Sequence, residues 1–144
     1  MVIVGLDPGI STGFCRLDQI EESLGIFVAT EFQTLSYSDL REFLVSGLMT
    51  ADVVVMERLP TYSLTSELMH ILDVVHDSIR QHKLSVETLH GEVKVFDVKQ
   101  ISPGEWKPVA KARKWESSKA RNQHERDAYC IAQYYVWTNL EKFL

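Results

Sequence analysis

Two short apolar runs, each followed by an acidic residue, constrain the fold of this chain more than any other feature. The first, Val2 to Leu6, is rich in β-branched residues and ends at Asp7, before the turn sequence Pro8-Gly9. The second, Val53 to Met56, is uninterrupted and ends at Glu57. Continuous apolar runs of this length are typical of buried strands. We therefore expect two buried strands, each with a carboxylate at its carboxyl end.

Weaker strand patterns complete a predicted sheet. Thr12 to Leu17 and Gly25 to Phe32 read as strands, with Asp18 to Ser23 as a polar connection between them. Together with the first run they predict an antiparallel meander. Val93 to Val98 predicts a fifth strand.

Three helices are expected between and after these strands. Ser38 or Asp39 can cap the first, and Asn122 with Glu125 resembles a capping box that opens the last. A long stripe from Leu64 to Ile79 predicts the second. Apolar residues recur at helical spacing in the first helix at Leu40, Phe43, Leu44 and Leu48, and in the last at Ala128, Ile131, Ala132 and Tyr135. The resulting order of elements predicts an α/β domain with a mixed sheet.

Length and composition narrow the class further. A chain of 144 residues that is 45% hydrophobic fits one domain, residues 1–144, with one packed core. The sequence has no basic leader and no run of eighteen apolar residues, so neither a signal peptide nor a membrane span is predicted. Cys15 and Cys130 lie inside apolar patterns, which indicates reduced core thiols in a cytoplasmic protein. A zinc site would need more ligands.

Charge is unevenly distributed along the chain. The formal net charge is -5, yet the segment from Lys99 to Arg126 holds eight Lys or Arg and three Glu, a local balance of +5. An acidic body with one basic segment is typical of a protein that meets a polyanion on one side. A solvated, poorly ordered loop explains the same charges equally well.

Three acidic residues and a histidine form the candidate chemistry. If the strands before Asp7 and Glu57 are parallel neighbours, both carboxylates lie at one edge of the sheet, where open α/β folds bind ligands. Asp127 and His124 are three residues apart and share one face of the last helix. Gathered carboxylates repel one another unless a cation is present, and hard oxygen ligands suit Mg²⁺ or Mn²⁺. Two such ions can promote phosphodiester hydrolysis.

Each of these residues also has an ordinary structural explanation. Asp7 before Pro-Gly can be a turn residue, and Glu57 can pair with Arg58. A His-x-x-Asp sequence in the first turn of a helix often only complements the helix dipole. The coincidence of three acids at neighbouring predicted positions favours the metal site.

The same segments resemble a known family. Ile3 to Gly9 with Thr12-Gly13 is similar to the first strand of the RuvC group of Holliday-junction resolvases, in the ribonuclease H-like superfamily. Val54 to Glu57 resembles its glutamate strand, and His124 to Ala128 resembles its acidic last helix. The resemblance spans nearly the whole chain and implies a ribonuclease H-like, five-stranded mixed sheet flanked by helices.

The resemblance also implies an activity and a site. It implies an endonuclease that cuts four-way junctions, with two Mg²⁺ or Mn²⁺ ions held by Asp7, Glu57, His124 and Asp127. Pro103 to Lys107 resembles the proline-and-lysine stretch of the family, so Lys107 and Lys119 are candidates for contacts to the scissile or adjacent phosphates. Lys111, Arg113 and Lys114 are expected to contact the backbone more widely. A homodimer is implied, because a four-way junction needs two cuts.

Other functions fit the residues as well. A nuclease of the same fold acting on RNA or on a flap is one alternative, and a non-catalytic nucleic-acid-binding module is another. The turn from Asp7 to Gly13 also resembles nucleotide-binding proteins of the actin and sugar-kinase type, but those need two lobes and this chain has one. Cleavage of a branched substrate separates these possibilities.

Overall fold

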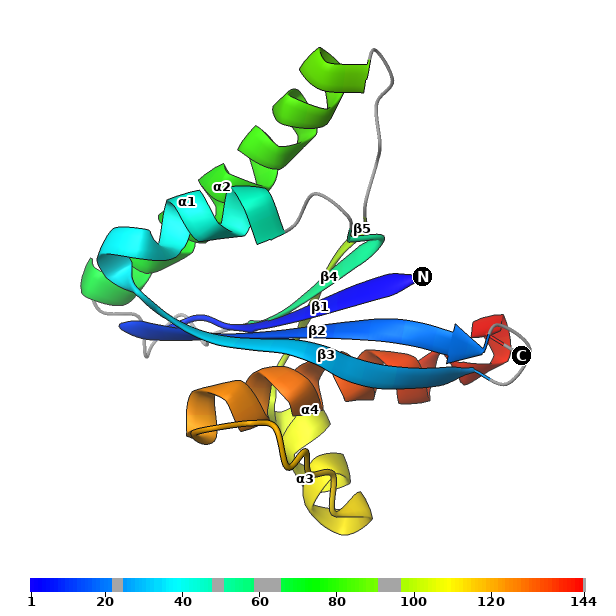
Figure 1. Ribbon diagram of the computed structural model, residues 1–144. Coiled ribbons are helices and arrows are strands. Elements are labelled where there is room, and N and C mark those ends of the chain that lie inside the picture. The colour runs from blue at the N-terminus through cyan, green and yellow to red at the C-terminus, as the bar shows by residue number, and fades with distance from the viewer. Residues whose placement is uncertain (22–24, 48–50, 59–65, 91–96, 144) are drawn as a thin grey trace.

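A five-stranded mixed sheet organises the molecule (Figure 1). The computed structural model describes residues 1–21, 25–47, 51–58, 66–90 and 97–143. The strand order is β3-β2-β1-β4-β5, with β1–β2 and β2–β3 antiparallel and β1–β4 and β4–β5 parallel. The strands are β1 (Val2–Asp7), β2 (Ser11–Glu21), β3 (Ile26–Ser36), β4 (Val53–Glu57) and β5 (Asp97–Ile101). The predicted meander and mixed sheet are confirmed.

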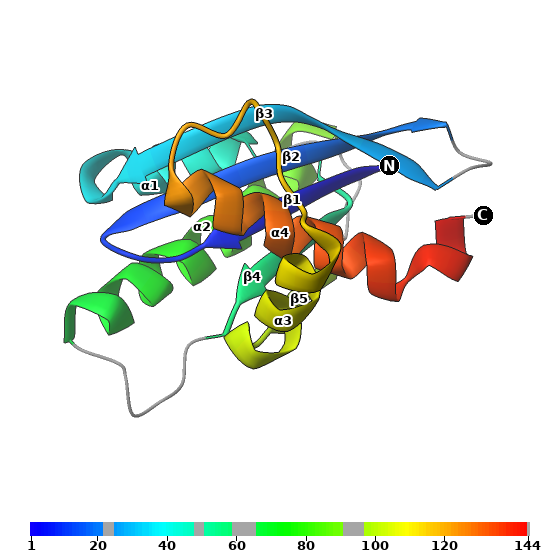
Figure 2. The ribbon, with the colours of Figure 1, turned by 90° about the horizontal axis from the view of Figure 1, so that it is seen from below.

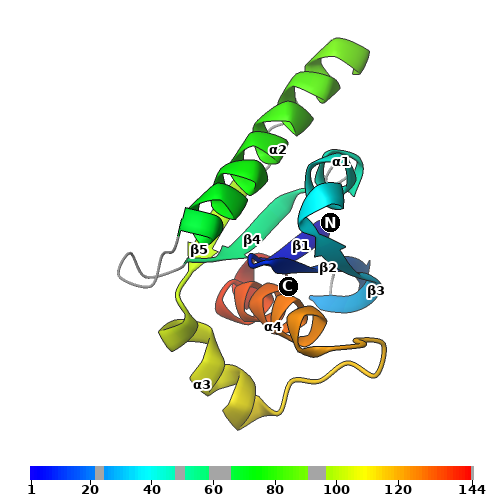
Figure 3. The ribbon, with the colours of Figure 1, turned by 90° about the vertical axis from the view of Figure 1, so that its left-hand side faces the viewer.

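Helices cover both faces of this sheet (Figures 1 and 3). On one face lie α1 (Tyr37–Gly47) and α2 (Ser66–His90), and on the other lie α3 (Pro103–Arg113) and α4 (Gln123–Thr138), followed by the 3₁₀ helix η2 (Leu140–Phe143). Each face has its own apolar core. Seen from below, α4 runs beneath the middle of the sheet and α3 lies beside it, near β4 and β5 (Figure 2).

The alternation of side chains decides which face each strand residue meets. In β1, Val4 and Leu6 belong to the core under α1 and α2, whereas Ile3 belongs to the core under α4. Successive strand residues point to opposite faces, so Asp7 shares the α4 face with Ile3. In β4, Val53 and Val55 likewise belong to the α4 core. Glu57 therefore points to the same face as Asp7.

Three strands differ from the prediction. β3 continues to Ser36, past the predicted end at Phe32. β2 continues through Asp18 to Glu21, so these residues are strand and not the polar connection that we expected. Asp18 is accommodated because the Arg16 guanidinium donates to it at 3.0 and 3.1 Å and the Thr30 hydroxyl donates to it from β3. β5 covers Asp97–Ile101, which overlaps the predicted strand Val93 to Val98 in two residues; residues 93–96 lie outside the described ranges.

The helix α3 was not predicted: Lys99 to Arg126 was expected as a basic segment that either meets a polyanion or forms a loop. Its start nevertheless carries a recognisable signal. Ser102 occupies the N-cap, Pro103 follows at the first helical position, and Glu105 Oε1 accepts hydrogen bonds from the Ser102 N–H (3.2 Å) and hydroxyl (2.9 Å). The helix ends where Lys114 adopts a left-handed conformation with φ 55°. The basic segment is therefore helical over Pro103–Arg113.

Two expectations drawn from composition concern the thiols and the membrane. Cys15 and Cys130 are both buried and free, as their apolar surroundings predict. Among the helices described, none combines enough length with enough apolar character to span a bilayer.

Candidate functional site

Asp7 and Glu57 are brought together by the pairing of β1 with β4. The two strands are parallel and in register from Ile3↔Val53 to Leu6↔Met56. The next residue on each strand is the carboxylate, and neighbouring strands lie about 4.8 Å apart. Both side chains therefore lie at the carboxyl edge of the sheet on the α4 face, as the sequence predicts.

The first turns of α4 lie unusually close to this edge, because two strand residues are glycine. A Cβ atom at Gly13 would lie 2.0 Å from the backbone oxygen of His124, and one at Gly5 would lie 2.2 Å from that of Ala128. Atoms cannot approach so closely, so a larger residue at either position would push the helix away. Gly13 is the register partner of Asp7. The close approach therefore places the start of α4 directly over Asp7.

A buried polar network fixes the start of α4 to β3. The Asn122 side chain caps the helix by accepting from the Glu125 N–H at 3.0 Å, as predicted. Glu125 is fully buried, but its carboxylate accepts from the Arg121 N–H and guanidinium and from the Thr34 hydroxyl, the last at 2.6 Å. Burial raises the pKa of Glu125, but these hydrogen bonds outweigh it and leave the pKa below its ordinary value. Glu125 thus anchors α4 and does not belong to the acidic cluster.

His124 and Asp127 complete the candidate site from α4. His124 Nδ1 lies 3.6 Å from Asp7 Oδ2, just beyond hydrogen-bond length. Asp127 Oδ1 accepts from the Gln123 side chain at 2.6 Å. Glu57 Oε2 accepts from the Trp106 indole N–H at 2.8 Å. We call Asp7, Glu57, His124 and Asp127 the acidic cluster.

The electrostatics show that the three carboxylates of the acidic cluster interact. Burial, followed by the negative charges of Glu57 and Asp127, raises the pKa of Asp7 to about 7, and Lys107 partly offsets this. Burial also raises the pKa of Glu57, against the Trp106 hydrogen bond and Lys107, with a further increase from Asp127. Without a cation, the site therefore carries more negative charge than its surroundings neutralise.

This charge excess is the observation that fits the cluster to a divalent cation. Carboxylate oxygens are the ligands that Mg²⁺ and Mn²⁺ prefer, and a bound cation would offset both the burial and the repulsion that raise the two pKa values. Within the part of the chain that the structure describes, no three His, Cys, Asp or Glu side chains converge closely enough to form a ready-made metal cage. The donor types and the charge fit such an ion, whereas the present side-chain positions are more open than a closed coordination shell.

The two predicted phosphate-contacting lysines are placed differently. Lys107 lies on α3, with its ammonium over the Trp106 ring at 5.6 Å, and it lowers the pKa values of both Asp7 and Glu57. Lys119 instead reaches the Ala29 backbone oxygen on β3 at 3.4 Å. Ala29 is in register with Leu17, and Leu17 with Ile3, four residues before Asp7 and so roughly 13 Å along the strand. The structure therefore brings Lys107 to the acidic cluster but not Lys119.

A cavity of about 540 Å³ between α3 and α4 leads away from the acidic cluster. Asp127 and Trp106 line it beside the cluster, and Lys107, Lys111 and Lys114 line its α3 side. Lys107 and Lys111 are one helical turn apart on α3, and Lys114 follows at its C-cap, so the three form one positive stripe along this side of the cavity. A negatively charged strand that occupies this cavity would meet the stripe and the acidic cluster together.

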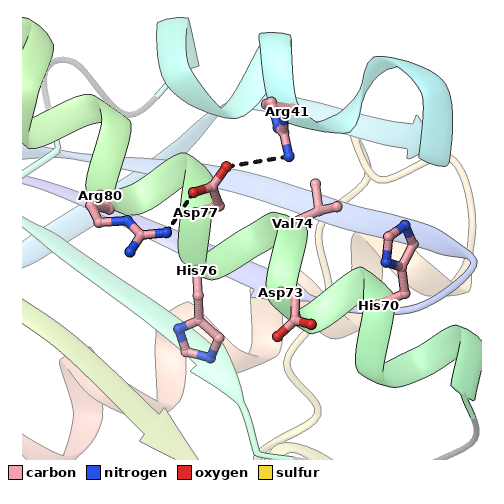
Figure 4. A pocket seen from close by; sticks show the side chains of 7 residues that line it. All are labelled: Arg41, His70, Asp73, Val74, His76, Asp77 and Arg80. Carbon is pink, nitrogen blue, oxygen red and sulfur yellow. Dashed lines mark hydrogen bonds and ion pairs between the residues drawn. The ribbon is translucent and has the colours of Figure 1, made fainter.

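Another cavity, of about 480 Å³, lies between α1 and α2, on the opposite face of the sheet (Figure 4). Its charged lining consists of Arg41, His70, Asp73, His76, Asp77 and Arg80. The Asp77 carboxylate accepts from Arg41 at 3.2 Å and from Arg80 at 2.6 Å, so its charge is neutralised within the protein. This contrasts with Asp7, and the α1–α2 cavity offers no comparable charge excess for a cation.

Sequence reasoning missed several residues that shape the site. The sequence assigned Trp106 no contact with the acidic residues, yet its indole N–H donates to Glu57. Gln123 precedes Asp127 by four residues, a spacing that signals a side-chain contact on a helix. No local signal points to the bond between Trp106 and Glu57, since they are 49 residues apart.

Comparisons with known proteins agree with this geometry. No protein-family model and no curated protein sequence matches the chain. Among solved structures, Thermus thermophilus RuvC is similar at TM-score 0.69 and 14% identity, over 99% of this chain and 98% of that chain. The structure of T. thermophilus RuvC in complex with a Holliday junction substrate is similar at TM-score 0.67 and 14% identity, over 97% of this chain and 96% of that chain.

Two further solved structures come from eukaryotic and viral sources. The yeast mitochondrial Holliday junction resolvase Ydc2 is similar at TM-score 0.60 and 14% identity, over 98% of this chain and 80% of that chain. The fowlpox virus resolvase in complex with Holliday junction DNA is similar at TM-score 0.55 and 12% identity, over 97% and 99% of the two chains. At these identities the similarity defines the fold, and the chain has the ribonuclease H-like fold of the RuvC-type Holliday junction resolvases.

Proposed function

We propose that this protein is a structure-selective endonuclease that cleaves four-way DNA junctions, with Asp7, Glu57, His124 and Asp127 as ligands for two Mg²⁺ or Mn²⁺ ions. The observation that carries this proposal is the pair of carboxylates at the carboxyl ends of the parallel strands β1 and β4, close enough to Asp127 on α4 that its charge acts on both. Burial, and then the charges of Glu57 and Asp127, raise the pKa of Asp7 to about 7. The solved structures with the same fold support the choice of substrate, since two of them hold Holliday junction DNA.

Each residue of the acidic cluster has a distinct task in this proposal. Divalent cations bound there would stabilise the charge that develops on a phosphodiester and make a water molecule more acidic. Asp7, Glu57 and Asp127 bind through oxygen. His124, which is about half exposed and lies 3.6 Å from Asp7, either completes the ligand set or carries a proton for the attacking water. By family analogy, cleavage leaves a 5′-phosphate and a 3′-hydroxyl.

The lysines of α3 bind the DNA backbone in this proposal. Lys107, beside the acidic cluster, contacts the scissile or an adjacent phosphate, and its positive charge also eases ionisation of Asp7 and Glu57. Lys111 and Lys114 follow along the same cavity, with Arg113 at the end of the helix. Lys119 lies farther along the sheet, where it contacts DNA away from the cut. Backbone contacts of this kind make binding strongly salt dependent.

We further propose that the active form is a homodimer in the cytoplasm. Two symmetric cuts across a four-way junction require two sites related by a two-fold axis, and an isologous dimer provides them. The helix α2 exposes Met69, with 55% of its surface accessible, on a face that could take part in the contact. Sedimentation of the protein at micromolar concentration measures this state directly.

Cleavage of a labelled four-way junction, compared with a linear duplex, tests the proposed activity. Wild-type protein with Mg²⁺ is expected to cut the junction and spare the duplex, and Asp7→Asn is expected to bind the junction without cutting it. If wild type binds both and cuts neither, the protein is a binding module of this fold. If it cuts a flap or an RNA in preference to the junction, the fold assignment stands and the substrate assignment fails.

A further inference from the structure

The contact between Trp106 and Glu57 connects α3 to the acidic cluster. Trp106 is 3% exposed, Glu57 is 8% exposed, and the indole N–H donates to Glu57 Oε2 at 2.8 Å. A buried carboxylate that has lost water needs such a donor to hold one orientation. Because the indole is a donor and carries no ionisable group, it orients the carboxylate without adding a positive charge that would repel a cation.

The position of Trp106 is itself tightly fixed. It lies in the first turns of α3, directly after the Ser102 and Glu105 cap and the Pro103 start. The start of α3 is tied to the end of β4, because the Arg58 N–H donates to the Ile101 oxygen at 2.7 Å. The indole also packs in the core under α4. The helix cap, the Arg58–Ile101 hydrogen bond and the core packing together fix the position of the indole N–H, which restricts the rotamers available to Glu57.

Trp106 supports a second residue of the site. The Lys107 ammonium lies over its ring, 5.6 Å from the centroid, within the range of a cation–π contact. One tryptophan therefore contacts both the carboxylate of β4 and the lysine that lowers the pKa of that carboxylate. A residue that served only to fill the core would need neither contact.

We propose that Trp106 is a positioning residue for metal binding: its indole N–H holds the Glu57 carboxylate in the orientation that receives a divalent cation. The inference rests on the proposed metal site and goes beyond it, because it assigns a function to a residue that does not itself bind the metal. Partners that orient metal ligands typically account for 10- to 100-fold of metal affinity or activity.

Trp106→Phe tests this assignment, since it keeps an aromatic ring in the core and removes the N–H. In metal-free protein titrated calorimetrically with Mn²⁺, the variant is expected to bind about 10-fold more weakly than wild type. Trp115→Phe is the matched control, because Trp115 also packs against the α4 core, and it is expected to bind Mn²⁺ as wild type does. If the two variants have similar melting temperatures, weaker Mn²⁺ binding by Trp106→Phe alone is due to the lost hydrogen bond to Glu57 and not to loss of packing.

An unchanged Mn²⁺ affinity in Trp106→Phe overturns the positioning role, while cleavage by wild type leaves the proposed nuclease standing. Conversely, weaker Mn²⁺ binding in the variant with no cleavage by wild type supports the positioning role and refutes the nuclease. A wild-type protein that binds no Mn²⁺ overturns both.

A second measurement does not depend on the folding of the variant. The chain has three tryptophans, so ¹⁵N-labelled wild type gives three indole N–H resonances, which Trp115→Phe and Trp137→Phe assign. Addition of Mg²⁺ is expected to shift the Trp106 resonance more than the other two. A Trp106 resonance that stays in place while Mg²⁺ binds contradicts the proposal.

Discussion

Replacing Asp7 with Asn is expected to stabilise the metal-free protein at pH 8 and to leave its stability nearly unchanged at pH 4. Asn has the shape of Asp but cannot ionise, so the change removes one charge from the acidic cluster and little else. Asp7 is the most informative residue for this test because its side chain is only 15% exposed and its pKa is raised by burial and then by the charges of Glu57 and Asp127.

The magnitude follows from the shift in pKa. The pKa of Asp7 rises from 3.8 to about 7 on folding, which is about 3 pKa units, and each unit corresponds to about 1.36 kcal/mol. Between these two values the folded protein binds more protons than the unfolded chain, so stability falls as the pH rises. The destabilisation of the folded protein by ionised Asp7 is absent below pH 4, grows from pH 4 to 7 and is complete above pH 7. Its upper bound is about 4 kcal/mol, and solvent relaxation should reduce it to roughly 2 kcal/mol.

Urea unfolding in EDTA, measured for both proteins from pH 4 to pH 8, gives the difference directly. The free energy of unfolding of Asp7→Asn minus that of wild type should rise from near zero to roughly 2 kcal/mol across this range. Subtracting the two curves removes the titration of groups that both proteins share. Saturating Mg²⁺ at pH 8 should then stabilise wild type more than the variant. A difference that does not change with pH would refute the electrostatic reasoning.

Three further changes test the packing and charge of the site. Gly13→Ala should lower the free energy of unfolding by about 2 kcal/mol in a thermal melt, since its Cβ would overlap the His124 oxygen; unchanged stability would contradict the close approach of α4. Arg121→Ala should lower the free energy of unfolding because it leaves the Glu125 carboxylate buried without its cation, whereas a neutral effect would show that the Thr34 hydroxyl and the backbone N–H of residue 121 satisfy that carboxylate. Lys107→Ala should slow junction cleavage by roughly 100-fold. Lys111→Ala should mainly weaken junction binding and reduce the slope of log affinity against log salt concentration by about one. Equal effects of the two substitutions on cleavage would contradict the placement of Lys107 beside the acidic cluster.

The central part of the site could be predicted because local rules determine it. Apolar runs ending at Asp7 and Glu57 indicate two buried strands, and parallel pairing places both acids at one sheet edge. The apolar stripe of the last helix requires that helix to lie on the sheet, which brings Asp127 to the same edge. The strands and the helix stripe follow from short-range periodicity, whereas the parallel pairing of β1 with β4 was a condition of the prediction that the structure meets.

The remaining features depend on how elements meet in space. Lys119 was expected to contact the scissile or an adjacent phosphate, but its ammonium donates to the Ala29 oxygen on β3. Lys119 lies between α3 and α4, where no helical or strand pattern predicts its position. The helix α3 was overlooked although Ser102 and Glu105 signal its start, because the positive charge of this segment does not distinguish a helix from a loop. The Trp106 hydrogen bond and the raised pKa of Asp7 both require the packing of α3 and α4 on the sheet. Such contacts follow from tertiary geometry and have no local sequence signal.

Crystals of the protein soaked in Mn²⁺ and measured at a wavelength where manganese scatters anomalously test the central claim most directly. The account predicts anomalous peaks within coordination distance of Asp7, Glu57 and Asp127, and their loss in Asp7→Asn. Peaks only elsewhere, or a wild-type cluster that remains without manganese at millimolar Mn²⁺, would contradict it.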